Sequence, residues 1–173
     1  MNDSRRDAFV KAYHPKTRED DFRTPEYILR YIERWSARAI THDGACSSDN
    51  AKREPIDIFS GEAIPDNSLI FINPPWDSPT VEKFVGMAYR RVLENPSVHV
   101  VFLLPNKLTE VRWVEGINDA FNHVIFLGGR VDFSGPHSVK GGASRWGCFL
   151  GWIGKGPTSM DSIRIKFLKA GLI

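Results

Sequence analysis

The sequence has few cysteines and no long apolar run. Only Cys46 and Cys148 are present among 173 residues, too few for a disulfide framework. No segment approaches the roughly 20 consecutive apolar residues that a membrane-spanning helix needs. The charged N-terminus is not followed by the apolar segment of a secretory signal. We therefore expect a protein of a reducing cytoplasm that has no contact with a membrane.

The chain also lacks a strong net charge and any pattern of metal ligands. Lys and Arg total 23 and Asp and Glu total 21, which gives a formal charge of +2. This balance neither demands nor excludes nucleic acid, so a basic surface would have to be local. The five histidines show no metal-ligand spacing, and we expect no metal. No Ser/His/Asp pattern with a nucleophile elbow is present either.

What is present is the composition of an ordinary folded domain. Hydrophobic residues make up 42% of the chain and charged residues 25%. A chain of this length can bury about 70% of the surface that its unfolded form exposes, so it can form a core unaided. Residues 1–23 are highly charged and are expected to be a mobile arm, and residues 24–173 a single domain.

Apolar runs and turn residues predict alternating strands and helices. Thr24 is expected to cap a helix in which Pro25 takes the first position. The other expected helices cover residues 80–93 and 111–121, with one further turn near 49–53. The expected strands are 39–42, 68–72, 98–104, 124–127, 149–153 and 163–168. This alternation predicts an α/β fold with a mainly parallel sheet flanked by helices.

In such sheets, ligands bind beyond the carboxyl ends of the strands. Two expected strand ends carry polar side chains there, Asp43 and Asn73. Their coincidence indicates a candidate site before any family is considered.

The most informative motif follows the second of these strands and reads Asn73-Pro74-Pro75-Trp76. The amine of adenine is a poor nucleophile because its lone pair is delocalised into the ring. Two carbonyl acceptors, from the Asn73 side chain and the Pro74 main chain, would favour a pyramidal nitrogen and stabilise its developing positive charge. Pro74 and Pro75 stiffen the loop, and Trp76 offers a face for stacking a flipped base. The alternative is a turn with Trp76 as a core anchor.

With this motif, the sequence resembles the phage-type DNA N6-adenine methyltransferases, often called the phage Dam family. The resemblance covers residues from about 24 to 153. The stretches that carry it are Thr24-Pro25, residues 41–45, residues 49–52, residues 73–76, with Trp where Tyr or Phe is usual, and residues 126–133. The family's glycine-rich loop after the first strand is replaced here by the small residues 44–48.

The resemblance implies a Rossmann-like sheet, S-adenosylmethionine as the methyl donor, and the cytoplasm of a bacterium or of a phage-infected host cell. By position, Asp43 would contact the amino acid or ribose portion of the donor, and Asp57 would lie near its adenine. The complete set implied for the cofactor is Thr24, Pro25, Asp43, Ala45 and Asp57. The alternatives are that Asp43 caps a turn and that Asp57 is a solvated turn acid.

Residues 128–147 are rich in Gly, Ser and basic groups and are expected to form a functional loop region. Arg130, Lys140 and Arg145 are candidates for contacts to DNA phosphates, with a solvated loop as the alternative. The short chain leaves little room for a separate target-recognition domain, and an oligomer remains open.

Three functions follow. The first is methyl transfer from S-adenosylmethionine to the N6 amine of adenine in DNA. The second is the same chemistry on another planar amine or amide, such as an RNA base or a glutamine side chain. The third is a non-catalytic nucleic-acid-binding module that retains a degraded methyltransferase pocket.

Overall fold

A computed structural model describes residues 23–46, 51–107, 118–134, 146–156 and 166–169. The elements in these ranges are two α-helices, one 3₁₀ helix and seven strands. In order they are α2 (Glu26–Ser36), β1 (His42–Asp43), β2 (Glu54–Pro55), β3 (Leu69–Ile72), α3 (Ser78–Glu94), β4 (His99–Pro105), the 3₁₀ helix η3 (Asn118–Ala120), β5 (His123–Gly128), β6 (Cys148–Ile153) and β7 (Lys166–Lys169).

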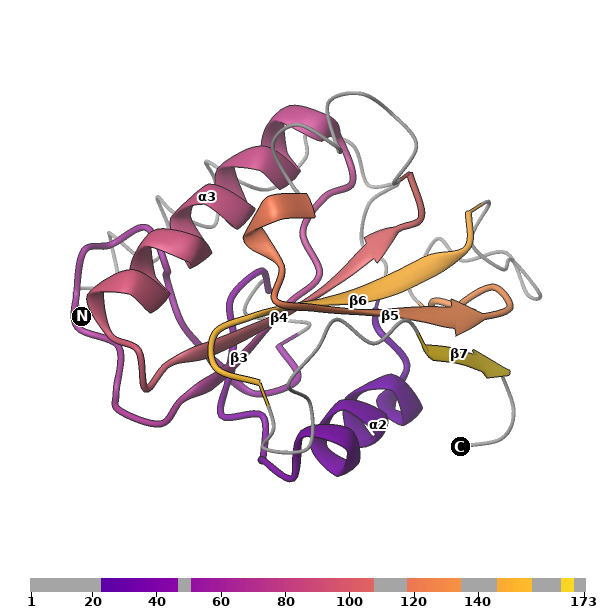
Figure 1. Ribbon diagram of the computed structural model, residues 1–173, viewed down its shortest axis with the longest axis horizontal. Helices are drawn as coiled ribbons and strands as arrows, with labels where there is room; N and C mark the ends of the chain where they lie inside the picture. Colours follow the sequence, from indigo (N-terminus) through magenta and orange to yellow (C-terminus); the bar gives the residue numbers. More distant parts are fainter. Residues whose placement is uncertain (1–22, 47–50, 108–117, 135–145, 157–165, 170–173) are drawn as a thin grey trace.

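The strands form one mixed sheet in the order β2-β1-β3-β4-β6-β5-β7 (Figure 1). β1 pairs in parallel with both β2 and β3, and β3 pairs in parallel with β4. β6 runs antiparallel to its neighbours β4 and β5, whereas β7 is parallel to β5. Among the described strands, β6 therefore runs against the others, and the predicted α/β fold is confirmed with a mixed sheet.

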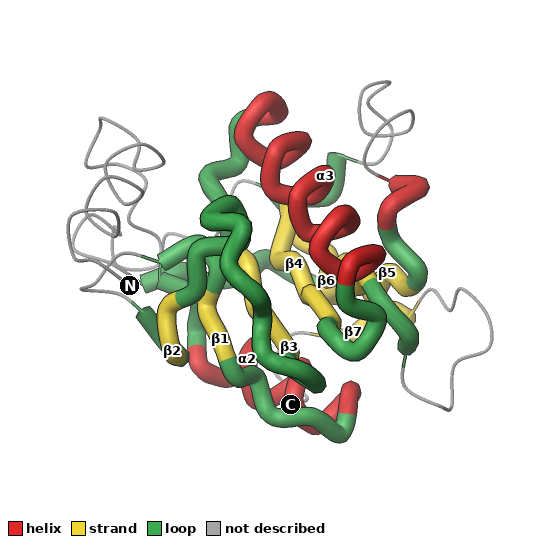
Figure 2. The backbone as a smooth tube through the Cα atoms, turned by 90° about the vertical axis from the view of Figure 1, so that its left-hand side faces the viewer, coloured by secondary structure: helices red, strands yellow, loops and turns green. Residues whose placement is uncertain are grey.

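Two helices cover opposite faces of this sheet (Figures 1 and 2). Side chains of β3 alternate between the faces: Ile70 and Ile72 belong to the core cluster that includes α3, and Leu69 and Phe71 to the cluster that includes α2. β4 alternates in the same way and is buried along its whole length. Burial on both faces explains why these strands read as almost continuous apolar runs in the sequence.

The two helices begin at different kinds of residue. Asp77 caps α3, and its side chain accepts a hydrogen bond from the Thr80 backbone N–H at 2.9 Å. α2 begins at Glu26 with Pro25 as its cap, one position later than expected, and no side chain caps it. It ends at Ala37, whose φ of 53° is left-handed.

Several expected boundaries were wrong. The strand expected at residues 39–42 is the two-residue β1, because the chain before it bridges from α2 to the sheet. Residues 51–53 are not helical, and β2 follows them directly. Pro55 argued against a strand in the sequence, because proline cannot donate a hydrogen bond to a neighbouring strand. β2 lies at the edge of the sheet, where proline is tolerated. Most of the expected helix 111–121 lies outside the described residues.

Candidate functional site

The order of the strands reverses between β1 and β3. From β1, the chain adds β2 on one side, whereas β3 and then β4 lie on the other side. A crevice outside the carboxyl ends of the strands is expected at such a reversal. Asp43 is the last residue of β1, and Asn73 directly follows β3. The two polar residues identified from the sequence therefore flank this point of the sheet.

The side chain of Asn73 is held by two partners. Its Nδ2 donates to Thr24 Oγ1 at 3.2 Å, and its Oδ1 accepts from the indole Nε1–H of Trp76 at 3.1 Å. Asn73 is half-buried, and Pro74 behind it is buried. The structure thus brings Thr24 and Asn73 together, although they are 49 residues apart in the sequence.

Thr24 is itself fixed in position. It is 4% exposed and immediately precedes the cap of α2. Its neighbour Arg23 forms an antiparallel bridge with Ser134, in which the Ser134 backbone N–H donates to the Arg23 carbonyl at 3.1 Å. Ordered structure therefore already includes Arg23, the last residue of the expected arm; residues 1–22 lie outside the described ranges.

Trp76 packs against the core on the α2 side of the sheet. Its ring meets Phe133 edge-to-face, with centroids 5.3 Å apart and planes at 78°. Phe133 is 7% exposed and is the last residue of the 126–133 stretch on which the resemblance to the phage family partly rests. Trp76 is half-buried, so it acts at least in part as the core anchor that the alternative interpretation describes.

Asp43 organises the loop that follows β1. One of its carboxylate oxygens accepts the N–H of Ala45 at 3.2 Å, and the other accepts the N–H of Lys52 at 3.3 Å. Burial raises the pKa of Asp43, and these hydrogen bonds and the charge of Arg53 oppose that rise. Ala45 is half-buried and packs against the core on the α3 side. Asp43 therefore has the turn-capping role, and each of its oxygens keeps a second lone pair.

Asp57 closes a turn two residues after β2. Its Oδ1 accepts the N–H of Phe59 at 2.8 Å, and its main-chain carbonyl accepts the N–H of Ser60 at 3.2 Å. The side chain is half-buried, and burial raises its pKa. These contacts support the interpretation of Asp57 as a turn acid more directly than a contact to a cofactor.

Of the three basic residues considered for DNA, the structure describes Arg130. It is exposed and lies two residues after β5, at the same edge of the sheet as Asn73. Lys140 and Arg145 lie outside the described residues.

The same edge carries an aromatic residue that sequence reasoning missed. Trp146 is 49% exposed and lies two residues before β6. The ammonium of Lys107, just beyond β4, lies 5.4 Å from the centroid of its ring. The two residues meet because β4 and β6 are antiparallel neighbours, a pairing that no local signal in the sequence reveals.

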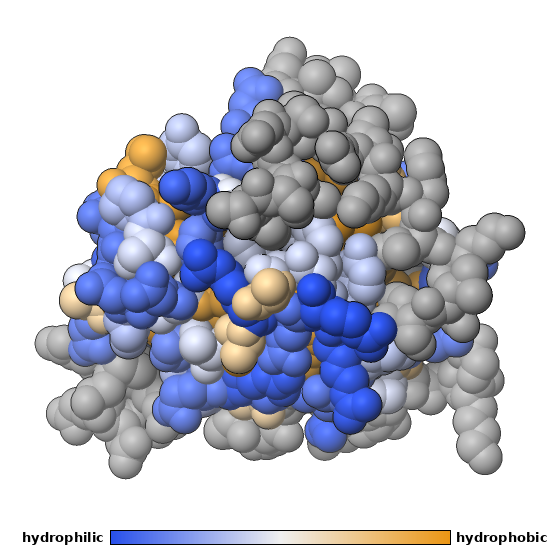
Figure 3. Space-filling view, turned by 60° about the horizontal axis from the view of Figure 1, so that its bottom comes forward, coloured by the Kyte–Doolittle hydropathy of each residue, from blue (hydrophilic) through white to orange (hydrophobic). Residues whose placement is uncertain are grey.

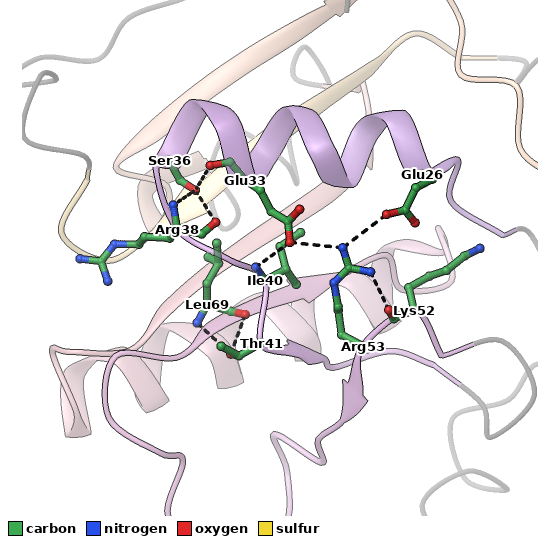
Figure 4. Close-up of polar contacts among 9 residues, drawn as sticks. All are labelled: Glu26, Glu33, Ser36, Arg38, Ile40, Thr41, Lys52, Arg53 and Leu69. Atoms are coloured by element: carbon green, nitrogen blue, oxygen red, sulfur yellow. Dashed lines mark hydrogen bonds and ion pairs between the residues drawn. The ribbon is translucent and has the colours of Figure 1, made fainter.

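An ion-pair network ties α2 to the edge of the sheet (Figure 4). Arg53 Nη2 lies 3.2 Å from Glu33 Oε1 and 3.4 Å from Glu26 Oε1. Glu33 Oε1 also accepts the backbone N–H of Ile40 at 3.0 Å. Figure 3 shows the molecule from the α2 side, where hydrophilic residues predominate at the centre of the view. The network holds α2, and with it Thr24, against β1 and β2.

Comparisons with known protein families, with curated proteins and with solved structures found no match. Within the described ranges, no helix has the length and apolar character to cross a membrane. The same ranges contain no group of three or more His, Cys, Asp or Glu residues that could hold a metal ion.

Proposed function

We propose that this protein transfers a methyl group from S-adenosylmethionine to the N6 amine of adenine in DNA, on a sheet of the Rossmann-like methyltransferase type. Asn73 and Pro74 supply the carbonyl oxygens that accept the two amine hydrogens. Trp76 provides the aromatic face beside the flipped base. The fold itself implies no single chemistry, so the proposal rests on the site.

The observation that carries the proposal is the meeting of three distant segments at one edge of the sheet. Thr24 bonds to Asn73, Trp76 bonds to Asn73 and packs on Phe133, and Arg23 bridges Ser134. Thr24, residues 73–76 and Phe133 each lie in a stretch that carries the resemblance to the phage family. Their convergence beside the reversal in strand order is what a binding site in such a sheet requires.

The acceptors act on the amine because they are held before the reaction begins. Pro74 and Pro75 restrict the backbone that carries both carbonyl groups, so little reorganisation is needed as positive charge develops on nitrogen. Asn73 is neutral and accepts hydrogen bonds through its carbonyl oxygen, which suits an amine that loses a proton only after nitrogen has attacked.

The residues at the ends of β1 and β2 are suited to a cationic cofactor. S-adenosylmethionine supplies a methyl group on a positively charged sulfur. Buried Asp43 is a carboxylate whose desolvation a neighbouring cation would offset. A Cβ on Gly44 would lie 3.0 Å from Ile72 Cγ1, so the backbone after β1 packs directly on β3. We assign the cofactor to Thr24, Pro25, Asp43 and Ala45, with Asp57 near its adenine.

The DNA would approach this edge of the sheet. An adenine inside a duplex must be flipped out to reach Asn73. Arg130, together with Lys140 and Arg145, would contact phosphates, which position the duplex without reading its sequence.

The direct test is to incubate the protein with methyl-labelled S-adenosylmethionine and unmethylated DNA, digest the DNA to nucleosides and identify the labelled one. We expect labelled N6-methyl-2′-deoxyadenosine from the wild type and almost none from Asn73→Ala. Asn106→Ala is the matched control, because Asn106 is an exposed asparagine just beyond the neighbouring strand β4. Parallel incubations use RNA and protein as acceptors. Label in RNA or in a protein amide, with none in DNA, would show that DNA adenine is not the substrate. Cofactor binding without any methyl transfer would favour a non-catalytic module.

A further inference from the structure

The hydrogen bonds around Asn73 permit only one orientation of its amide. The indole nitrogen of Trp76 is a donor and never an acceptor, so the Asn73 atom that faces it must be the carbonyl oxygen. The Nδ2 group then points to Thr24, whose hydroxyl oxygen accepts. Turning the amide by half a rotation would set two donors against each other at Trp76.

This orientation decides which atom a substrate amine would meet. The Oδ1 atom has two lone pairs, and Trp76 uses one of them. The second remains to accept a hydrogen from an incoming amine. In the opposite orientation, the amine would face the NH₂ group of Asn73, and two donors cannot bond to each other.

We propose that Thr24 and Trp76 are positioning residues that set the Asn73 amide to accept the target amine. The inference rests on the proposed methyl transfer and adds to it a role for the Thr24 hydroxyl and for the indole N–H. Thr24 then affects the target amine indirectly, because it orients the Asn73 amide that contacts this amine. Trp76 likewise acts through its N–H, in addition to any stacking by its ring.

Both partners are held firmly enough to serve this purpose. Thr24 is 4% exposed and is fixed between the Arg23–Ser134 bridge and the start of α2. The ring of Trp76 is held by its edge-to-face contact with Phe133. A functional side chain oriented by packed, hydrogen-bonded neighbours needs little reorganisation during the reaction.

The test compares Thr24→Val, which keeps the shape and loses the hydroxyl, with Thr24→Ser, which keeps the hydroxyl. We expect kcat to fall by about tenfold or more in Thr24→Val, because a misaligned acceptor no longer meets the amine. Thr24→Ser should recover most of that loss. Because Thr24 is also assigned to the cofactor site, we expect the fall in kcat to exceed any change in the dissociation constant for S-adenosylmethionine. Thermal unfolding of both variants reports whether they fold.

Trp76→Phe tests the second partner in the same assay. It keeps an aromatic ring and removes the N–H donor, so we expect kcat to fall while cofactor binding persists. A kcat equal to the wild-type value in both Thr24→Val and Trp76→Phe would overturn the positioning role. So would a loss in Thr24→Val that is entirely a loss of cofactor affinity, since Thr24 would then act on the cofactor alone.

A second readout needs no activity. The indole N–H of Trp76 gives an NMR signal that is identified by its absence in Trp76→Phe. In the wild type, this proton should exchange slowly with solvent. We expect faster exchange in Thr24→Val, where Trp76 alone holds the amide, and wild-type exchange in Thr24→Ser. Unchanged exchange in Thr24→Val would contradict the inference. Absence of methyl transfer by the wild type would overturn the proposed function. The exchange rates test the orientation of Asn73 separately, because they do not depend on methyl transfer.

Discussion

Gly44 packs against the side chain of Ile72 so closely that a Cβ atom has almost no room between them. Such an atom would lie 3.0 Å from Ile72 Cγ1 and 3.1 Å from Ile70 Cγ2. Both isoleucines are fully buried in β3, so either would have to shift within the core to make room. The N–H of Gly44 also donates to the Phe71 carbonyl at 2.9 Å. Glycine at this position therefore permits the close approach of the β1 loop to β3.

Replacing Gly44 with alanine should destabilise the fold by about 1–3 kcal/mol, the usual cost of overpacking a core. The matched control is Gly86→Ala. Gly86 lies within α3, where an added Cβ would meet nothing within 4 Å. That variant should gain roughly 0.5–1 kcal/mol, because alanine favours a helix interior over glycine. Denaturant unfolding measures both changes, and effects of the same sign would contradict this account.

The ion-pair network on α2 predicts unequal roles for its two acids. Glu33 Oε1 accepts the Ile40 N–H and contacts Arg53, whereas Glu26 contacts Arg53 and is more exposed. Glu33→Ala should cost about 1–2 kcal/mol because a backbone N–H loses its partner. Glu26→Ala should cost less than about 0.5 kcal/mol and depend on salt. Equal losses in urea unfolding would show that the bond to Ile40 contributes little.

His99 predicts a loss of stability in acid. Burial, with a smaller effect of the Arg38 charge, lowers its pKa from 6.5 to about 4. The unfolded chain therefore binds a proton between these pH values while the native state does not, so stability is full above pH 6.5 and falls as the pH drops towards 4. The loss should reach roughly 3 kcal/mol. In His99→Leu, the free energy of unfolding should depend less on pH between 6.5 and 4. If that dependence is the same as in the wild type, groups other than His99 cause the loss of stability in acid.

Asp43 should affect cofactor binding before it affects chemistry. Asp43→Asn keeps the size of the side chain and removes its charge, so a positively charged donor should bind about tenfold or more weakly, a loss of about 1.4 kcal/mol. Asp57→Asn is the comparison: Asp57 chiefly closes its own turn and is assigned only near the adenine, so this variant should weaken binding less than Asp43→Asn does. Calorimetric titration with S-adenosylmethionine measures both. Equal affinity in Asp43→Asn and the wild type would remove Asp43 from the cofactor site.

The sequence predicted the parts of the fold that local patterns encode. The run before Pro105 is apolar throughout because β4 is buried on both faces. β2 escaped prediction because a two-residue edge strand containing Pro55 carries no periodic signal. The reversed direction of β6 also has no local cause, since it depends on where β4 and β5 lie in the sheet.

The candidate site was predictable residue by residue, although its contacts were not. The strand end and the prolines identified Asn73, and the cap preference identified Thr24. Nothing in the sequence joins the two, because their hydrogen bond exists only after α2 has docked on the sheet. The packing of Phe133 on Trp76 is likewise a product of tertiary structure.

The central claim is that the Asn73 carbonyl acts on the reacting amine, and paired measurements on Asn73→Ala test it most directly. The single-turnover rate of methyl transfer to DNA should fall by about 10²–10³-fold, as when one oriented hydrogen-bonding group is lost from an active site. The dissociation constant for S-adenosylmethionine should change by less than about threefold, which is under 1 kcal/mol. A rate close to that of the wild type, or a rate loss fully explained by weaker cofactor binding, would contradict the account.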